Sequence, residues 1–173
     1  MVKRSKYFGK IIVNKDMSGI EKHKNKKHFI SFTENHMNDD EKILDVIDGL
    51  FGTLMETKGD NKQESGLLFC TNQKVSFHRK GIFSDLSRSI PIKKISSIDV
   101  DKGILFHKIV FHTSGDKILF ECSEGMDDVK NFVKQVEKMR DEIEESSENS
   151  QEPGNSKKSD DPIEKLKKLK ELK

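Results

Sequence analysis

Histidines, cysteines and clustered acids are the residues of this chain whose types could support catalysis or bind a metal ion. Their spacing places no nucleophile, base and orienting group together, which predicts a protein with no enzymatic activity and no cofactor. His107 and His112 are five residues apart in a strand-like segment, so we expect them on opposite faces and not around one metal ion. His23 and His28 lie in a lysine-rich run and are expected to be exposed. The sequence therefore predicts no metal site.

The two cysteines, Cys70 and Cys122, both lie inside apolar, strand-like runs. Two cysteines are too few for a disulfide framework, so we expect buried free thiols in a reducing compartment. The basic start of the chain is followed by only a short apolar run, far short of a signal peptide, and no stretch approaches the ~18 apolar residues of a membrane span. These patterns predict a cytoplasmic protein that is, at most, peripheral to a membrane.

Charge is unevenly distributed along the chain, although the formal net charge is only +2. Residues 1–36 hold nine Lys and Arg against three acids, and residues 141–161 hold eight acids against two Lys. Such charged ends are typical of solvated flanks around a near-neutral folded unit. We expect four parts: a basic N-terminal appendage over 1–36, a domain over 37–145, a disordered linker over 146–161 and a short helix over 162–173.

Short apolar runs predict seven strands between about residues 43 and 121, including Ile104 to Phe106 as a strand-forming run. They lie close together in the sequence, which indicates antiparallel pairing with short connections. The apolar period then changes from two to 3.6 residues and predicts one amphipathic helix. Its stripe consists of Val129, Phe132, Val133, Val136, Met139 and Ile143. The pattern therefore predicts a mainly β fold closed at one end by a C-terminal helix.

Gly66 to Phe77 (GLLFCTNQKVSF) holds two apolar runs around a Thr-Asn turn that is followed by a basic residue. This segment resembles the second and third strands of the bacterial YokE-like pleckstrin-homology (PH) domain family. Ile90 to Ile98 (IPIKKISSI) resembles the next segment, and Gly103 to Ile109 the hairpin after it. The resemblance covers roughly residues 37–143. It implies a PH-like, seven-stranded antiparallel β-sandwich or partly open barrel, capped by a C-terminal α-helix.

Basic side chains are the candidate ligand-binding residues that this resemblance implies. In lipid-binding PH domains, the loop between the first two strands contacts phosphate groups, and here Lys58 and Lys62 flank Gly59-Asp60-Asn61. A second basic group follows on the third and fourth predicted strands. The candidates for binding an anionic ligand are Lys58, Lys62, Arg79, Lys80, Arg88, Lys93 and Lys94. For both groups, lysines and arginines that are merely solvated are the alternative.

The end of the chain, from Asp161 to Leu172, resembles the start of SHOCT, a short C-terminal domain that often follows such modules. The family pattern continues into a turn and a second helix, and this sequence ends before them, so we expect a partial SHOCT-like helix. A three-turn helix is marginal alone in water, and its apolar side chains favour a partner surface. Those side chains are Ile163, Leu166, Leu169 and Leu172.

Three functions are compatible with these patterns. The leading hypothesis is a binding or scaffold module that assembles with a protein partner or with itself. The alternative is peripheral binding to anionic membrane lipids through the basic arm and the first strand loop. A second, weaker alternative is nucleic-acid binding by the arm, which has few aromatic residues for stacking.

Overall fold

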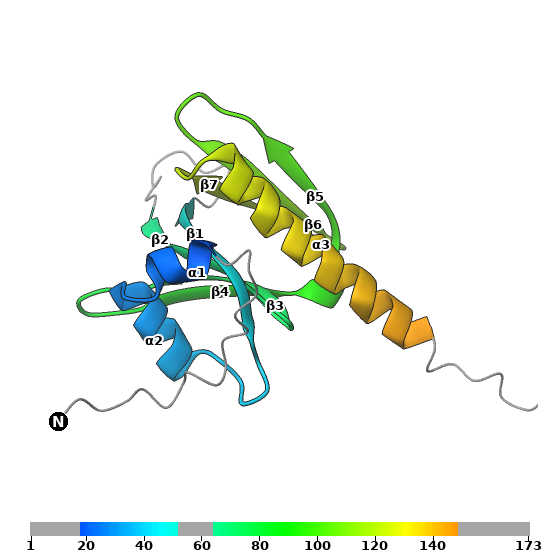
Figure 1. Cartoon of the computed structure of the whole chain (residues 1–173), viewed down its shortest axis with the longest axis horizontal. Helices are drawn as coiled ribbons and strands as arrows, with labels where there is room; N and C mark the ends of the chain where they lie inside the picture. The colour runs from blue at the N-terminus through cyan, green and yellow to red at the C-terminus, as the bar shows by residue number, and fades with distance from the viewer. Residues whose placement is uncertain (1–17, 52–63, 149–173) are drawn as a thin grey trace, which may run out of the picture.

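The predicted order of seven strands and one helix is confirmed by a computed structural model, which describes residues 18–51 and 64–148. The strands form one antiparallel sheet in the order β4-β3-β2-β1-β7-β6-β5 (Figure 1). In the described parts of the chain no pairing joins β4 to β5, so the sheet is not closed. The elements are β1 (Ile43–Phe51), β2 (Glu64–Thr71), β3 (Lys74–Arg79), β4 (Leu86–Pro91), η2 (Ile92–Lys94), β5 (Ile95–Asp101), β6 (His107–Thr113), β7 (Lys117–Cys122) and α3 (Met126–Glu148).

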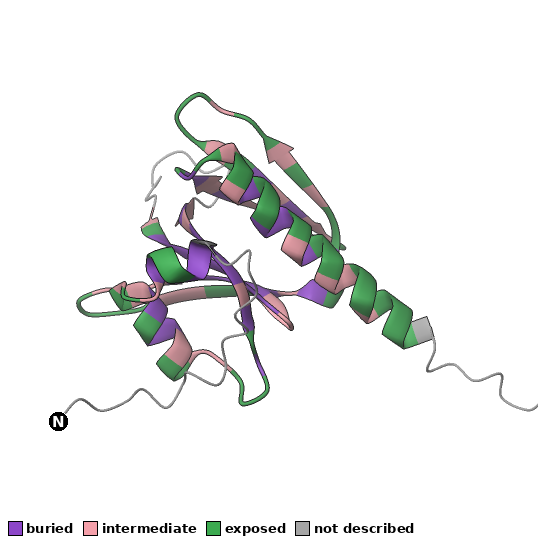
Figure 2. Ribbon diagram, in the orientation of Figure 1, coloured by how far each residue is buried: buried purple, intermediate pink, exposed green. Residues whose placement is uncertain are grey.

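The main core lies between the inner face of the sheet and α3. The helix contributes the buried side chains of Val129, Phe132, Val133 and Val136, which pack with inward-facing side chains of the sheet. Beyond them α3 continues past the sheet, and its C-terminal half is mostly exposed (Figure 2). The predicted stripe is therefore buried in its first half, whereas Met139 and Ile143 are only half-buried.

Two helices that the sequence did not predict cover the outer face of β1 and β2: α1 (Ser18–His23) and α2 (Lys27–Asn35) (Figure 1). Ile20, Phe29 and Phe32 of these helices form a second core with outward-facing apolar side chains of the strands. The rings of Phe32 and Phe69 are stacked at 3.9 Å between centroids. Residues 18–35 thus pack on the sheet, while the proposed domain boundary at residue 36 remains a prediction.

Strand β2 is buried on both faces. Leu67 and Phe69 enter the outer core, and Leu68 and Cys70 enter the inner one. Neighbouring strand residues point to opposite faces, so a strand covered on both sides reads as a continuous apolar run. Cys70 and Cys122 are free and buried, as predicted. Burial raises the pKa of Cys122 to about 11, so this thiol stays protonated at neutral pH.

The Thr-Asn turn between β2 and β3 is held by a buried hydrogen-bond network. Thr71 Oγ1 donates to the fully buried carboxylate of Glu41 at 2.7 Å and accepts from the backbone N–H of Lys74 at 3.0 Å. The Lys74 ammonium forms an ion pair with Glu41 at 3.0 Å. Asn72 Oδ1 accepts from the backbone N–H of Lys42 at 2.7 Å. The motif that carries the family resemblance is therefore structural here.

The expectation that His23 is exposed is wrong, because its side chain is fully buried. Its Nε2–H donates to Glu124 Oε1 at 2.6 Å, and Glu124 Oε1 also accepts from the backbone N–H of Asp48 at 2.9 Å. Lys22 pairs with the second oxygen at 3.1 Å. Burial alone would raise the pKa of Glu124, but the contacts with His23, Asp48 and Lys22 outweigh it and lower that pKa to about 2. These contacts join α1 to Glu124, which lies in the connection between β7 and α3.

Candidate functional site

Two strand connections, β3–β4 and β5–β6, leave the sheet at the end where β1 finishes and β2 begins. The β3–β4 connection adjoins the start of β2, because Arg79 at the end of β3 forms an ion pair with Glu64 at 2.8 Å. The β5–β6 connection adjoins the end of β1, because Glu121 pairs in register with both Leu50 of β1 and Lys108 of β6. Phe51 and Glu64, the paired ends of β1 and β2, therefore lie between these two connections.

Both connections are tight bends with the same close approach at their first residue. In Gly81-Ile82-Phe83-Ser84, a Cβ added to the glycine would overlap the backbone carbonyl oxygen of Ser84. In Gly103-Ile104-Leu105-Phe106, the same atom would overlap the carbonyl oxygen of Phe106. Each bend closes so tightly that only glycine fits its first position. The two residues after each glycine then project from the end of the sheet.

We call Ile82, Phe83, Ile104 and Leu105 the apolar tips. Their exposed fractions are 90%, 100%, 102% and 80%, respectively. Bends are ordinarily built from Gly, Pro, Asn, Asp and Ser, and exposed apolar side chains are common only when they are scattered singly. Two adjacent pairs at one end of a small domain are therefore unusual, and they are the leading candidates for a contact surface.

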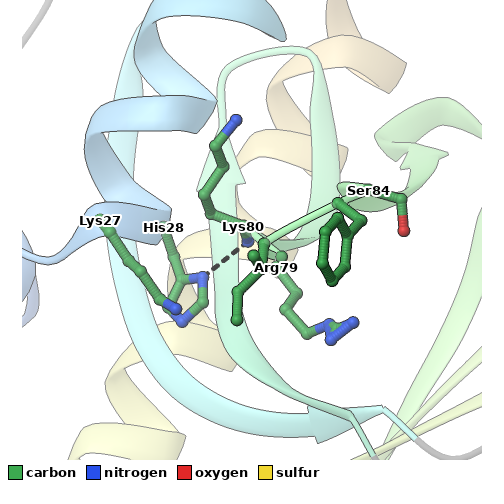
Figure 3. Close-up of a pocket in the computed structure, with 8 residues that line it drawn as sticks. Lys27, His28, Arg79, Lys80 and Ser84 are labelled. Atoms are coloured by element: carbon green, nitrogen blue, oxygen red, sulfur yellow. Dashed lines mark hydrogen bonds between the residues drawn. The ribbon is translucent and has the colours of Figure 1, made fainter.

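A basic hollow of about 390 Å³ lies beside the first bend (Figure 3). It is lined by Lys27 and His28 from the N-terminal helices and by the chain from Arg79 to Ser84. Arg79 and Lys80 are neighbours on a strand end, and their side chains point away from each other (Figure 3). The hollow thus receives basic groups from both the helices and the sheet.

Most charges around this hollow are balanced. Lys80 Nζ lies 3.0 Å from Asp85 Oδ2, and Arg79 pairs with Glu64. Burial and the nearby Lys27 lower the pKa of His28, whose Nδ1 accepts from the backbone N–H of Lys80 at 2.7 Å. His28 is therefore neutral and half-buried, not solvated as expected from the sequence. Within the described residues, no acid lies at ion-pair distance from Lys27.

The structure separates the basic residues singled out in the sequence. Lys58 and Lys62 lie outside the described residues. Arg79 and Lys80 line the hollow, and the exposed Arg88 pairs in register with Phe77. The exposed Lys93 and Lys94 lie in η2, at the opposite end of β4, six strand residues or roughly 20 Å away. They do not join Arg79 and Lys80, and anionic-ligand binding by any of the seven remains a prediction.

The apolar tips were missed in the sequence for a specific reason. Ile104, Leu105 and Phe106 were assigned to a strand because apolar runs favour strands, but β6 begins only at His107. Gly103, directly before them, was the available signal. The same pattern of a glycine followed by apolar residues occurs at Gly81. The four apolar helix residues Ile163, Leu166, Leu169 and Leu172 lie outside the described part of the chain.

The sequence pattern of the bacterial PH domain family matches residues 37–138. The chain belongs to this family. The match spans all seven strands and most of α3, and it confirms the PH-like, mainly β fold. The finer resemblance to the YokE-like branch and the SHOCT-like segment remain predictions. No curated protein matches the chain.

Two solved structures with PH domains align with part of this chain. The Vps36 N-terminal PH domain aligns with a TM-score of 0.48 and 14% identity over 62% of this chain and 84% of its own. A DUF1696 family protein with a pleckstrin-homology domain from Shewanella loihica aligns with a TM-score of 0.42 and 19% identity over 60% and 85%. In the described residues of the PH domain, no helix has the length and apolar character needed to cross a membrane.

Proposed function

We propose that this PH domain is a non-enzymatic module that binds peripherally to membranes containing anionic lipids. PH domains generally mediate protein or lipid interactions. The observation that favours a lipid bilayer is the pair of apolar tips, four almost fully exposed large side chains at one end of the sheet. A bilayer accepts apolar side chains of any shape, whereas a protein partner needs a complementary groove.

The apolar tips supply most of the binding free energy. Burial of one large apolar side chain stabilises by about 1.5–3 kcal/mol when complete. Insertion of four tips to partial depth is sufficient for the weak, reversible affinity that is typical of interfacial anchors. The rigid bends add to this, because the tips are already presented in the inserting arrangement and little conformational entropy is lost.

The basic hollow supplies a smaller electrostatic contribution. A Lys or Arg near an anionic bilayer contributes about 1 kcal/mol. Arg79 and Lys80 are already paired with Glu64 and Asp85, so Lys27 is the better contact of the hollow for lipid phosphates. The exposed Lys102, directly before the Gly103 bend and outside the hollow, is a second such contact. We therefore expect phosphatidylserine to strengthen binding and salt to weaken it, with apolar insertion dominant.

Sedimentation with lipid vesicles tests this function. The chain should sediment with phosphatidylcholine vesicles that contain phosphatidylserine, and less with phosphatidylcholine alone. The double variant I82S/F83S should bind at least ~10-fold more weakly, since the loss of two partly inserted side chains exceeds ~1.4 kcal/mol. The variant I104S/L105S should show a similar loss.

Ile30→Ser is the matched control. Ile30 is also an exposed apolar side chain, with an exposed fraction of 46%, but it lies on α2 and not on a bend. Its replacement should leave sedimentation unchanged. The proposal fails if the unaltered chain stays in the supernatant at low salt, or if I82S/F83S sediments as the unaltered chain does.

Assembly with a protein partner or with itself remains the second hypothesis. Its sequence support, the apolar helix over 162–173, lies outside the described residues, as do residues 1–17 of the basic arm proposed to bind nucleic acid. If vesicles are not bound but the apolar tips are buried on self-association, light scattering would detect a dimer that I82S/F83S abolishes.

A further inference from the structure

His78 is a buried histidine that has no hydrogen bond to any described residue. Its side chain is fully buried on β3, and neither ring nitrogen has a partner in the described structure. An unpaired buried polar group ordinarily costs about 1–3 kcal/mol, so each such group in a native protein calls for an explanation. The ring lies in the seam between β3 and α2, 4.5 Å from the His36 ring and 6.0 Å from the Phe32 ring.

We propose that His36, His78 and Asp85 form a binding site for a divalent transition metal ion such as Zn²⁺. One ligand atom of each residue lies within 4.8 Å of the others. Two imidazoles and a carboxylate are a common ligand set for Zn²⁺, which binds them at about 2.0–2.2 Å and takes water at a fourth position. A bound ion would satisfy the unpaired nitrogen of His78.

The supporting elements allow the small closure that the metal requires. Ligand atoms around tetrahedral Zn²⁺ lie about 3.4 Å apart at those bond lengths, so the three side chains need to approach by roughly 1 Å. His36 is the C-cap of α2 and half-exposed, and Asp85 lies in the loop before β4, so both can move. These two residues also provide the ion with an access route from solvent.

Asp85 already has partners, which set its role. Its Oδ2 accepts from Ser31 Oγ at 3.3 Å and from Lys80 Nζ at 3.0 Å. A carboxylate has about four lone-pair positions on its two oxygens, so these contacts do not exhaust it. The two imidazoles are therefore the principal ligands, and Asp85 completes the set.

A second cluster, His23, Asp48 and Glu124, has a similar composition but a different state. There the imidazole donates to Glu124 at 2.6 Å, and lysine ammonium groups already pair with both carboxylates. A metal ion would have to displace two lysines and the hydrogen bond of His23 there, but only Lys80 from Asp85 at the first site. His23 Nδ1 also lacks a hydrogen bond, whereas both ring nitrogens of His78 lack one among the described residues. The metal proposal does not depend on membrane binding.

Calorimetric titration of the full chain with ZnCl₂, after removal of metals by a chelator, tests the site. We expect one Zn²⁺ per chain and a rise in melting temperature on Zn²⁺ addition. His78→Phe should weaken Zn²⁺ binding at least 10-fold and abolish the rise. This variant should fold, because phenylalanine has a similar planar shape and the nitrogens it removes make no hydrogen bonds. Asp85→Asn should weaken binding by a smaller factor.

His112→Gln is the matched control. His112 also lies on a strand beside a carboxylate, with Nε2 donating to Asp99 Oδ2 at 2.7 Å, and its loss should leave Zn²⁺ binding unchanged. The proposal is overturned if the unaltered chain shows no heat of binding and no shift in melting temperature. It is equally overturned if His78→Phe binds Zn²⁺ as tightly as the unaltered chain.

Discussion

Two histidines, His23 and His78, lie where the N-terminal helices meet the sheet, and both are fully buried. His23 donates to Glu124, which also accepts from Asp48 and contacts Lys22. The His78 ring lies against the rings of Phe32 and His36, and neither of its nitrogens has a hydrogen-bond partner among the described residues. The two side chains are equally buried, but only the His23 ring has a hydrogen-bond partner among the described residues.

This difference separates a structural contact from a candidate ligand site. A buried polar group that has its hydrogen bonds stabilises the arrangement that provides them, and its removal leaves its partners unpaired. A buried polar group without hydrogen bonds stabilises nothing by itself, so its replacement is tolerated. The same residue type thus stabilises the packing of α1 at His23, whereas at His78 it is free to bind the proposed metal ion.

The largest expected effect is at the partnered histidine. Glu124→Gln removes the charge that Lys22 and His23 contact and should lower the free energy of unfolding by about 3 kcal/mol. Urea unfolding at pH 7 measures it. The control is Glu142→Gln, which alters an exposed Lys138–Glu142 pair and should cost no more than about 0.5 kcal/mol. An equal loss of unfolding free energy in the two variants would refute the stabilising role of Glu124.

Acid should remove the same stabilisation. The contacts with His23, Asp48 and Lys22 lower the pKa of Glu124 from its ordinary 4.5 to about 2, so the unfolded chain binds this proton first. Stability from Glu124 is therefore complete above pH 4.5 and is lost as pH falls from 4.5 towards 2. Unfolding curves across this window should converge for the unaltered chain and Glu124→Gln. A constant separation down to pH 2 would contradict the assignment.

Asp45 of β1 is also buried, but its pKa shift has the opposite sign to that of Glu124. Asp45 accepts from the backbone N–H of Val46 at 2.8 Å, but burial and the charge of Glu124 raise its pKa from 3.8 to about 6. The folded chain therefore binds this proton more readily, and stability falls as pH rises from 3.8 to 6. Asp45→Asn should gain about 1 kcal/mol at pH 7 and lose that gain at pH 3. Thermal unfolding at both pH values measures it.

The smallest effect is expected at the unpartnered histidine. In metal-free buffer, His78→Phe should leave the free energy of unfolding within about 1 kcal/mol of the unaltered chain, because no hydrogen bond is lost. Urea unfolding with a chelator present measures this. A loss as large as that of Glu124→Gln would show that His78 is as firmly integrated as His23, and the contrast between them would disappear.

Much of the fold was predictable because it depends on local periodicity. The seven strands and α3 follow from apolar runs and from a stripe that repeats every 3.6 residues. Burial on both faces explains the continuous apolar run of β2, but the sequence did not identify the helices that cover its outer face. α1 and α2 are short, and their few apolar residues are separated by lysines.

The candidate surfaces were less predictable than the fold. Ile104 and Leu105 have the residue types of a strand, and only the closure of the bend at Gly103 places them in solvent. Lys93 and Lys94 follow the third and fourth strands in sequence, but an intervening strand carries them to the other end of the sheet. Spacing along the chain predicts an element, whereas proximity between elements depends on register.

The sequence by itself determined a mainly β PH domain with a C-terminal helix, because alternation and helical periodicity are properties of consecutive residues. Only the tertiary structure decided which polar groups are buried and with which partners. His23 meets Glu124 across 101 residues, and His36 meets His78 across 42. Such contacts arise from the packing of two helices on one face of the sheet, and no local pattern encodes that packing.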